Sequence, residues 1–163
     1  MNQTPKLLLL LLLFIGFYST THADDADDIS AIIQNEKAPE GVVFEILASR
    51  NGLQWAIPRI KDFSSQLRKR FPNIAIAVVS HGNEQFALQS KYSTKYSSVH
   101  KQVRGLVNDD DIKIHVCGTF AEWRGVSPEE FPDYIDVSAE GPAQIHDYEA
   151  LGYITVVLSK PER

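Results

Sequence analysis

Five short apolar segments follow one another along the chain from position 42 onward, and they predict the strands of one sheet. They cover residues 42–47, 74–79, 112–118, 134–137 and 154–158. The run 74–79 is apolar at every position rather than at every second one. That pattern is typical of a strand covered by helices on both faces of a parallel sheet. The segments therefore indicate a five-stranded, mostly parallel sheet.

The segments between these strands have helical periodicity. A helix is predicted over 53–70 because apolar residues recur there at steps of three or four. The stripe consists of Ala56, Ile60, Phe63, Leu67 and Phe71. Segment 84–107 has two apolar groups around a polar stretch and predicts two helices or one broken helix. A short helix starts at 127–128, and another covers 142–151. This alternation of strands and helices predicts an α/β fold, a three-layer α/β/α sandwich.

The third predicted strand carries the only cysteine of the chain at its carboxyl end. Polar and apolar residues alternate in 112–118, so His115 and Cys117 are expected on one face of the strand. Residues 119–122 then have the side chains of a helix capping box. A thiol just before a helix N-terminus lies in a positive field that favours the thiolate, which is the nucleophilic form. Cys117 is therefore the first candidate for chemistry.

A structural role for Cys117 is the alternative. Free cysteine is among the most buried residue types and packs as a small hydrophobe. Two observations favour chemistry: the position at the carboxyl end of a strand, where open α/β sheets bind ligands, and an export signal, described below, that implies an oxidising compartment. A single cysteine cannot form an intramolecular disulfide, so a lone thiol in an exported protein suggests intermolecular pairing or a reactive group.

Three further residues are candidates to support the thiol. His81 follows the second predicted strand, so it lies at the same level of the sheet as Cys117. His81 or His115 could accept a proton from the thiol or donate a hydrogen bond to it, and Arg124 could stabilise the resulting anion. For His81, the alternative is a loop histidine that bonds a backbone carbonyl.

A metal site built from Cys117, His81, His115 and His146 is a further alternative, because Cys and His ligands suit zinc or copper. Such a site needs side chains from distant positions to converge. No short CxxC or HxxxH spacing supports it. The prediction is therefore a site with no metal and no cofactor.

The N-terminus has the pattern of a secretory signal peptide over residues 1–23. The apolar run 7–17 is too short to span a bilayer comfortably, and Ala23 suits the position before a cleavage site. An uncleaved anchor is the alternative. We expect a periplasmic or secreted protein that has no membrane segment after cleavage. Residues 24–40 are expected to form an acidic flexible leader with at most one short helix, and residues 41–163 the domain.

The charge balance narrows the range of partners. The chain has a formal net charge of −5, from 16 Lys and Arg against 21 Asp and Glu. Signal cleavage makes the protein more acidic, because the segment removed contains one lysine and no acid. An acidic domain is a poor candidate for binding nucleic acid or anionic lipid. Nucleic acid is therefore not an expected partner.

Three stretches together resemble the DsrE/DsrF-like family. They are AVVSHGNEQFAL at 77–88, IKIHVCGTFAEWRGVSPEEF at 112–131 and AQIHDYEALGYITVV at 143–157. The resemblance lies in their order and spacing and covers the chain from 42 to 158. It implies a three-layer α/β/α fold and assembly into dimers, trimers or hexamers. In the sulfur-relay members it also implies a cysteine that carries sulfur as a persulfide, and that cysteine maps onto Cys117.

The expected function follows from the thiol and the resemblance together. We expect a periplasmic sulfur carrier or sulfurtransferase that accepts sulfane sulfur on Cys117 and passes it to an acceptor thiol. Its partners would be a second copy of the chain, and donor and acceptor proteins or low-molecular-weight thiols. The alternative is a non-catalytic oligomeric binding module whose cysteine is structural.

Overall fold

The computed structural model describes residues 25–158, and a five-stranded parallel sheet forms its centre. The strands are β1 (Gly41–Ile46), β2 (Ala75–Ser80), β3 (Lys113–Cys117), β4 (Asp136–Ser138) and β5 (Tyr153–Leu158). Their order across the sheet is β4-β3-β2-β1-β5, and each neighbouring pair is parallel. The predicted α/β sandwich is confirmed, and the sheet is parallel throughout.

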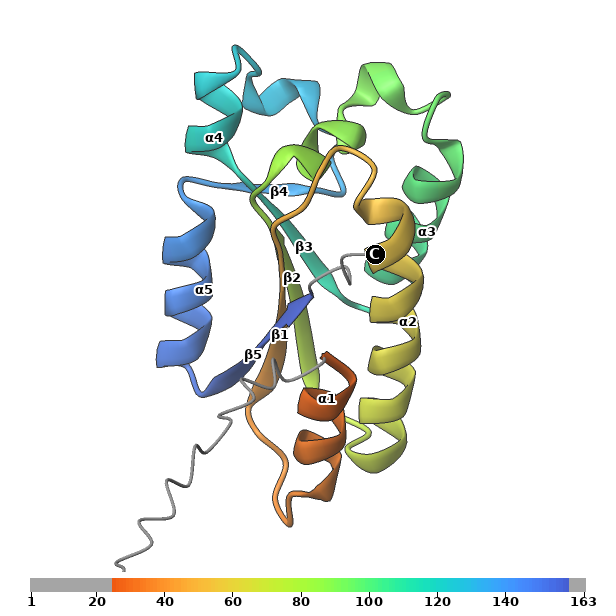
Figure 1. The fold of residues 1–163 in the computed structure, drawn as a ribbon, viewed down its shortest axis with the longest axis vertical. Coiled ribbons are helices and arrows are strands. Elements are labelled where there is room, and N and C mark those ends of the chain that lie inside the picture. Colours follow the sequence, from red (N-terminus) through yellow and green to blue (C-terminus); the bar gives the residue numbers. More distant parts are fainter. Residues whose placement is uncertain (1–24, 159–163) are drawn as a thin grey trace, which may run out of the picture.

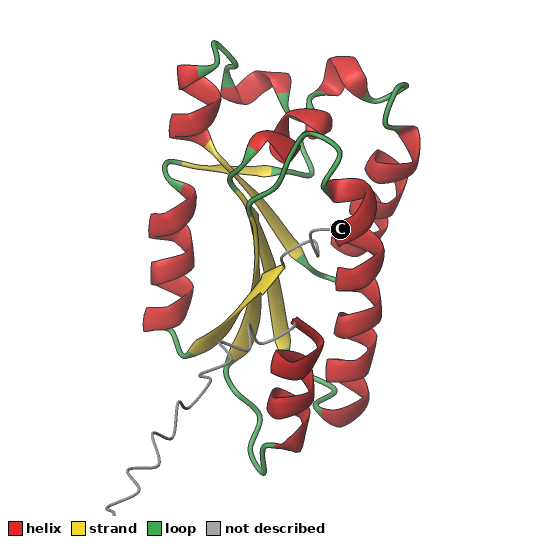
Figure 2. Ribbon diagram, viewed as in Figure 1, coloured by secondary structure: helices red, strands yellow, loops and turns green. Residues whose placement is uncertain are grey.

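Helices cover both faces of this sheet, which gives three layers (Figure 1, Figure 2). One face carries α1 (Asp25–Gln34), α2 (Leu53–Arg70) and α3 (Ser97–Asn108), and the other carries α5 (Gly141–Ala150). The carboxyl end of the sheet carries the short elements: 3-10 helices η1 (Asn83–Leu88), η2 (Ser90–Tyr92) and η3 (Pro128–Glu130), and helix α4 (Gly118–Trp123). The break expected within 84–107 is confirmed, because the regular helix starts only at Ser97.

The two faces of the sheet bury side chains in separate clusters. In β1, the side chains of Val42, Phe44 and Ile46 enter the large cluster beneath α2 and α3. Val43 belongs to the smaller cluster beneath α5, with Tyr148 of that helix. Strands buried on both faces need apolar residues at consecutive positions, which explains the unbroken runs in the sequence.

The segment expected to be a flexible leader differs from that expectation. Its residues 25–34 form α1, and Ile29 and Ile32 of this helix are buried in the large core cluster. The carboxylate of Asp25 is also buried and accepts a 2.7 Å hydrogen bond from Nε of Arg59 in α2. The helix is therefore packed and not loose. The predicted signal peptide lies outside the described residues.

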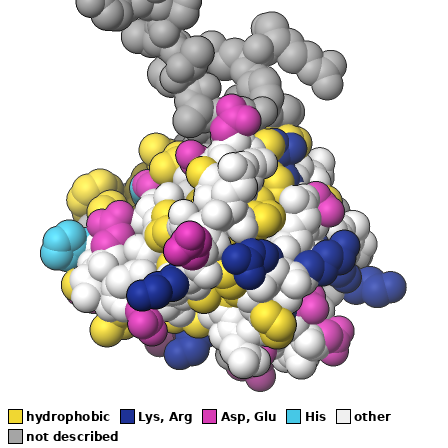
Figure 3. Space-filling view, turned by 90° about the horizontal axis from the view of Figure 1, so that it is seen from below, with side chains coloured by type: hydrophobic (Ala, Val, Ile, Leu, Met, Phe, Trp, Pro, Cys, Tyr) yellow, Lys and Arg dark blue, Asp and Glu magenta, His cyan; other side chains and the backbone are white. Residues whose placement is uncertain are grey.

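Two surface properties bear on the expected partners. Figure 3 shows the end of the molecule at which the strands begin, where Lys and Arg side chains are interspersed with Asp and Glu. Charges of both signs are thus mixed on the part of this face that the described residues form. Within residues 25–158, no helix has the length and apolar character needed to cross a membrane.

Candidate functional site

The carboxyl ends of β1, β2 and β3 lie side by side and bring the candidate residues together. Ser80 pairs with Val116 across β2 and β3, so the next residues in register are His81 and Cys117. Neighbouring parallel strands lie about 4.8 Å apart. The predicted common level of His81 and Cys117 is therefore confirmed.

Helix α5 begins directly over these two side chains. A methyl group built on Gly141 would lie 2.5 Å from Cβ of His81 and 3.3 Å from Cβ of Cys117. Only a residue without a side chain fits at this contact. His81 and Cys117 thus flank the same glycine on the α5 face of the sheet.

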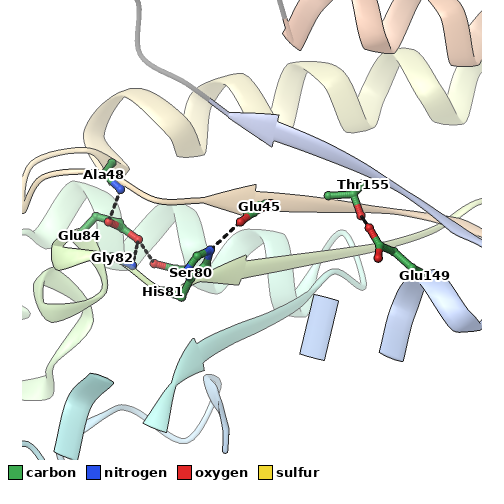
Figure 4. Close-up of polar contacts among 8 residues, drawn as sticks. All are labelled: Glu45, Ala48, Ser80, His81, Gly82, Glu84, Glu149 and Thr155. Carbon is green, nitrogen blue, oxygen red and sulfur yellow. Dashed lines mark hydrogen bonds and ion pairs between the residues drawn. The ribbon is translucent and has the colours of Figure 1, made fainter. Parts of the chain in front are cut away.

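A carboxylate from β1 bonds His81 from one side-chain level below this pair, since Glu45 is in register with Val79 and His115. Nε2 of His81 lies 2.8 Å from Oε1 of Glu45, as Figure 4 shows. Glu45 faces the α5 side because it alternates with Phe44 and Ile46, which face the other side. Glu45 was not among the predicted site residues, and its signal was the single charge within the apolar run 42–47. His81 bonds a carboxylate and not the backbone carbonyl of the alternative prediction.

The thiol of Cys117 is shielded from solvent, and the backbone of this residue is held by a side chain of η1. Cys117 is a free cysteine with 6% of its surface exposed. Its backbone N–H donates a 2.8 Å hydrogen bond to Oε1 of Gln85, which is fully buried. Nε2 of the same Gln85 is buried without a hydrogen-bond partner among the residues described. The backbone of Cys117 is thus held by a side chain from η1.

The predicted helix start after the thiol differs in detail. The predicted capping box makes Thr119 the N-cap, but helix α4 begins at Gly118 with Cys117 as its N-cap, two residues earlier. Thr119 does not cap the helix, because its backbone N–H and its hydroxyl both donate to the carbonyl of Ala139 at 2.9 Å. These bonds tie the start of α4 to the end of β4.

His115 shares the α5 face with Cys117, as the alternation in the strand predicted, and both of its ring nitrogens are engaged. Nε2 lies 2.8 Å from the hydroxyl of Tyr148, and Nδ1 lies 3.1 Å from Oγ of Ser138. Ser138 donates its own proton to Oε1 of Gln144 at 2.9 Å. Nδ1–H therefore donates to Ser138, and Nε2 accepts from Tyr148.

Burial keeps His115 neutral. The side chain lies between β3 and α5, and loss of solvation lowers its pKa below the ordinary 6.5, an effect that Asp136 opposes and Lys113 reinforces. With both nitrogens occupied and the charged form disfavoured, His115 links α5 to the sheet. It has no free nitrogen to offer the thiol.

Arg124 lies on the surface at the end of α4. It donates a 2.7 Å hydrogen bond to Oδ1 of Asn83, and its guanidinium lies over the rings of Phe120 and Phe86 at 5.6 and 6.0 Å. No contact joins it to Cys117 in the part of the chain that the structure describes. Arg124 therefore secures α4 against η1 in this conformation.

A buried carboxylate fixes the loops from which this site is built. Glu84 is fully buried and accepts hydrogen bonds from the backbone N–H of Ala48 at 2.7 Å, from that of Gly82 at 2.8 Å and from the hydroxyl of Ser80 at 2.8 Å (Figure 4). Its partners come from the ends of β1 and β2. Glu84 thus fixes the loop after β1 and the end of β2, which lie next to Glu45 and His81.

The surroundings of Cys117 include an open pocket. A pocket of about 680 Å³ lies between α4 and the end of β4, and its lining includes Gly118, Thr119, Val137 and Ser138. It begins at the residue that follows the thiol. Between residues 25 and 158, no group of three His, Cys, Asp or Glu side chains is placed to hold a metal ion, and His146 lies exposed on α5.

Comparison with known proteins identifies the fold of the chain. No family model and no curated protein sequence matches the chain. The solved structures that match it include three that align with it over most of their own length. MTH1491 from Methanobacterium thermoautotrophicum, a protein of unknown function, is 17% identical with a TM-score of 0.58, over 72% of this chain and 97% of its own.

The other two structures are similarly distant in sequence. The ychN protein from E. coli is 13% identical with a TM-score of 0.52, over 72% of this chain and 98% of its own. BT1422 from Bacteroides thetaiotaomicron, a conserved protein of unknown function, is 14% identical with a TM-score of 0.51, over 71% and 94%. Residues 25–158 therefore have the DsrE/YchN-like fold, to which these three structures belong.

Proposed function

We propose that the protein is a sulfur carrier that holds sulfane sulfur as a persulfide on Cys117. One observation carries the proposal: the only thiol of the chain ends β3 at the carboxyl edge of the sheet, level with His81. Ligands of open α/β sheets bind at this edge. The resemblance to sulfur-relay proteins and the DsrE/YchN-like fold support the same chemistry.

The reaction needs no external oxidant. The thiolate of Cys117 attacks the outer sulfur of a donor persulfide, R–S–SH. The S–S bond of the donor breaks, a new S–S bond forms on Cys117, and the donor leaves as the thiolate R–S⁻. Attack by an acceptor thiolate on the outer sulfur of the loaded cysteine passes this sulfur on in the same way. The pocket of about 680 Å³ beside Gly118 offers room for the donor.

We propose further that the carrier works outside the cytoplasm and as an oligomer of identical chains. The signal-peptide pattern of residues 1–23 supports export, and the family resemblance supports self-association. Donor and acceptor would then be exported proteins or small persulfides and thiols of the same compartment.

A second candidate function is a non-catalytic binding module in which Cys117 only packs. The observation that favours it is the 6% exposure of Cys117 beneath Gly141. This candidate predicts a thiol that does not react in the folded protein.

Intact-mass spectrometry distinguishes the two functions. The wild-type protein and Cys117→Ser are exposed to glutathione persulfide or polysulfide. A sulfur carrier gains the mass of one or more sulfur atoms, loses it on reduction, and shows no gain in the variant. If the folded wild-type protein gains no sulfur from any donor, the carrier proposal is wrong and the packing role is favoured.

A further inference from the structure

We propose that Glu45, His81 and Cys117 form a triad in which His81 accepts the proton of the thiol. Glu45 orients the imidazole of His81 and stabilises the imidazolium that forms. This inference rests on the proposed function and assigns the residues that activate its nucleophile. The triad is built at three adjacent strands, since Glu45 is in β1, His81 directly follows β2 and Cys117 ends β3.

The hydrogen bond to Glu45 fixes which nitrogen of His81 is available. An ionised carboxylate only accepts hydrogen bonds, so Nε2 of His81, at 2.8 Å from Oε1 of Glu45, carries the proton. In neutral imidazole the other nitrogen, Nδ1, is then an acceptor. Within residues 25–158, Nδ1 has no hydrogen-bond partner, in contrast to both nitrogens of His115.

The ring of His81 and the side chain of Cys117 meet at the same glycine. Nδ1 is bonded to Cγ, and Cγ of His81 lies 3.1 Å from the position that a Cβ of Gly141 would take. Cβ of Cys117 lies 3.3 Å from the same position. Both side chains therefore approach the start of α5 from neighbouring strands, and the triad requires rotation of the Cys117 side chain about its Cα–Cβ bond to bring the thiol to Nδ1. A nucleophile beside a base that a third group orients is the general arrangement of activated thiols and hydroxyls.

The side chains of His81 and Glu45 lie close together and are mostly shielded from solvent. The side chains of His81 and Glu45 are 11% and 24% exposed, so water screens the pair only in part. When Sγ of Cys117 gives its proton to Nδ1, the imidazolium lies against the Glu45 carboxylate. After the thiolate takes the outer sulfur from the donor persulfide, Nδ1–H returns the proton to the departing donor thiolate. Atoms, charges and electrons balance without another reactant.

Alkylation of Cys117 by iodoacetamide at a series of pH values tests the triad without a sulfur donor. His81→Gln is expected to lower the rate at neutral pH by about tenfold or more, since a positioned base contributes at least this much. The rate should return to that of the wild type near pH 10, where a free thiol ionises without help. A merely structural defect would persist at high pH.

Glu45→Gln tests the positioning residue, and it keeps the proposal testable if His81→Gln folds poorly. Gln retains an acceptor for Nε2–H but removes the charge, so we expect a loss of about threefold at neutral pH, smaller than that of His81→Gln. Glu149→Gln is the matched control, because Glu149 is an exposed carboxylate of α5 that bonds the Thr155 hydroxyl at 2.7 Å on the same side of the sheet (Figure 4). It should react as the wild type does.

The triad is overturned if His81→Gln and Glu45→Gln are both alkylated at the wild-type rate at neutral pH. This result is separable from failure of the carrier function. A wild-type protein that alkylates in the predicted manner but gains no sulfur refutes the carrier and supports the triad. Equal sulfur loading and equal alkylation in wild type and His81→Gln refute the triad and support the carrier.

Discussion

The backbone N–H of Cys117 donates a 2.8 Å hydrogen bond to Oε1 of Gln85, a side chain that lies 32 residues earlier in the chain and has no exposed surface. The peptide group of the thiol residue lies beyond the last pair of β2 and β3, Ser80 with Val116. Gln85 supplies a hydrogen-bond acceptor at a level where β2 no longer pairs with β3. The geometry at the thiol therefore depends on η1 as much as on β3.

Gln85→Met is expected to destabilise the protein by about 1–3 kcal/mol, because it leaves the buried N–H of Cys117 without an acceptor. Loss of Nε2 adds nothing to this cost, since that atom already lacks a partner. Unfolding in urea measures the difference. Gln54→Met, at an exposed position of α2, is the control and should change stability by less than about 0.5 kcal/mol. Equal stabilities of the two variants would contradict the assigned bond.

Gly141→Ala is expected to destabilise the protein although alanine is the better helix former. The added methyl would lie 2.5 Å from Cβ of His81, and neither residue can withdraw without moving α5 from the sheet. Overpacking of this kind costs about 1–3 kcal/mol, and Gly141 is the first residue of α5, where alanine gains less than the roughly 1 kcal/mol of a helix interior. Thermal unfolding measures the result, and alkylation of Cys117 should become faster as α5 lifts.

Gly105→Ala is the matched control for this substitution. Gly105 lies within α3, and the nearest atom to its added methyl is an Asp109 oxygen at an ordinary 3.6 Å. The same exchange should stabilise the protein there by up to about 1 kcal/mol. If both substitutions stabilised the protein, or both destabilised it, the contact between Gly141 and His81 would not determine the effect of Gly141→Ala on stability.

Much of the fold could be predicted from the sequence because parallel strands covered on both faces require unbroken apolar runs. The strand at 74–79 and the helix at 53–70 were placed within a residue of β2 and α2. The packing of α1 was missed because only three of its residues, Ile29, Ile32 and Ile33, are large and apolar. The buried ion pair of Asp25 with Arg59 joins distant segments and leaves no local pattern.

The site was partly predictable for the same reason. The carboxyl ends of consecutive parallel strands meet at one edge, so His81 and Cys117 could be placed at one level before the structure was known. Glu45 was not found, because one charge in a strand does not reveal which side chain it meets. The capping pattern at Thr119 was misleading because that side chain bonds Ala139, which is distant in sequence.

The stability of the protein is expected to fall as the pH drops below about 6.5, and His115 is one cause. Burial holds the pKa of His115 in the folded protein below its ordinary 6.5, and it also lowers the pKa of His100. Below about pH 6.5 these two histidines bind protons in the unfolded chain but remain largely unprotonated in the folded protein. The free energy of unfolding therefore decreases as the pH falls from about 6.5 toward the folded pKa. Well above pH 6.5 both histidines are neutral in the folded and in the unfolded state. They then add nothing to the slope of the free energy of unfolding against pH.

His115→Gln should flatten this dependence, whatever its effect on stability at neutral pH. The measurement is urea unfolding of wild type and variant at several pH values between about 7 and 5, where the histidine contribution changes. His146→Gln, at an exposed position of α5, should retain the wild-type slope. Because the acidic residues are common to all three proteins, their protonation cancels in the comparison. Parallel stability curves for wild type and His115→Gln would mean that His115 takes up its proton as readily in the folded protein as in the unfolded chain, and the neutral link between Tyr148 and Ser138 would then be wrong.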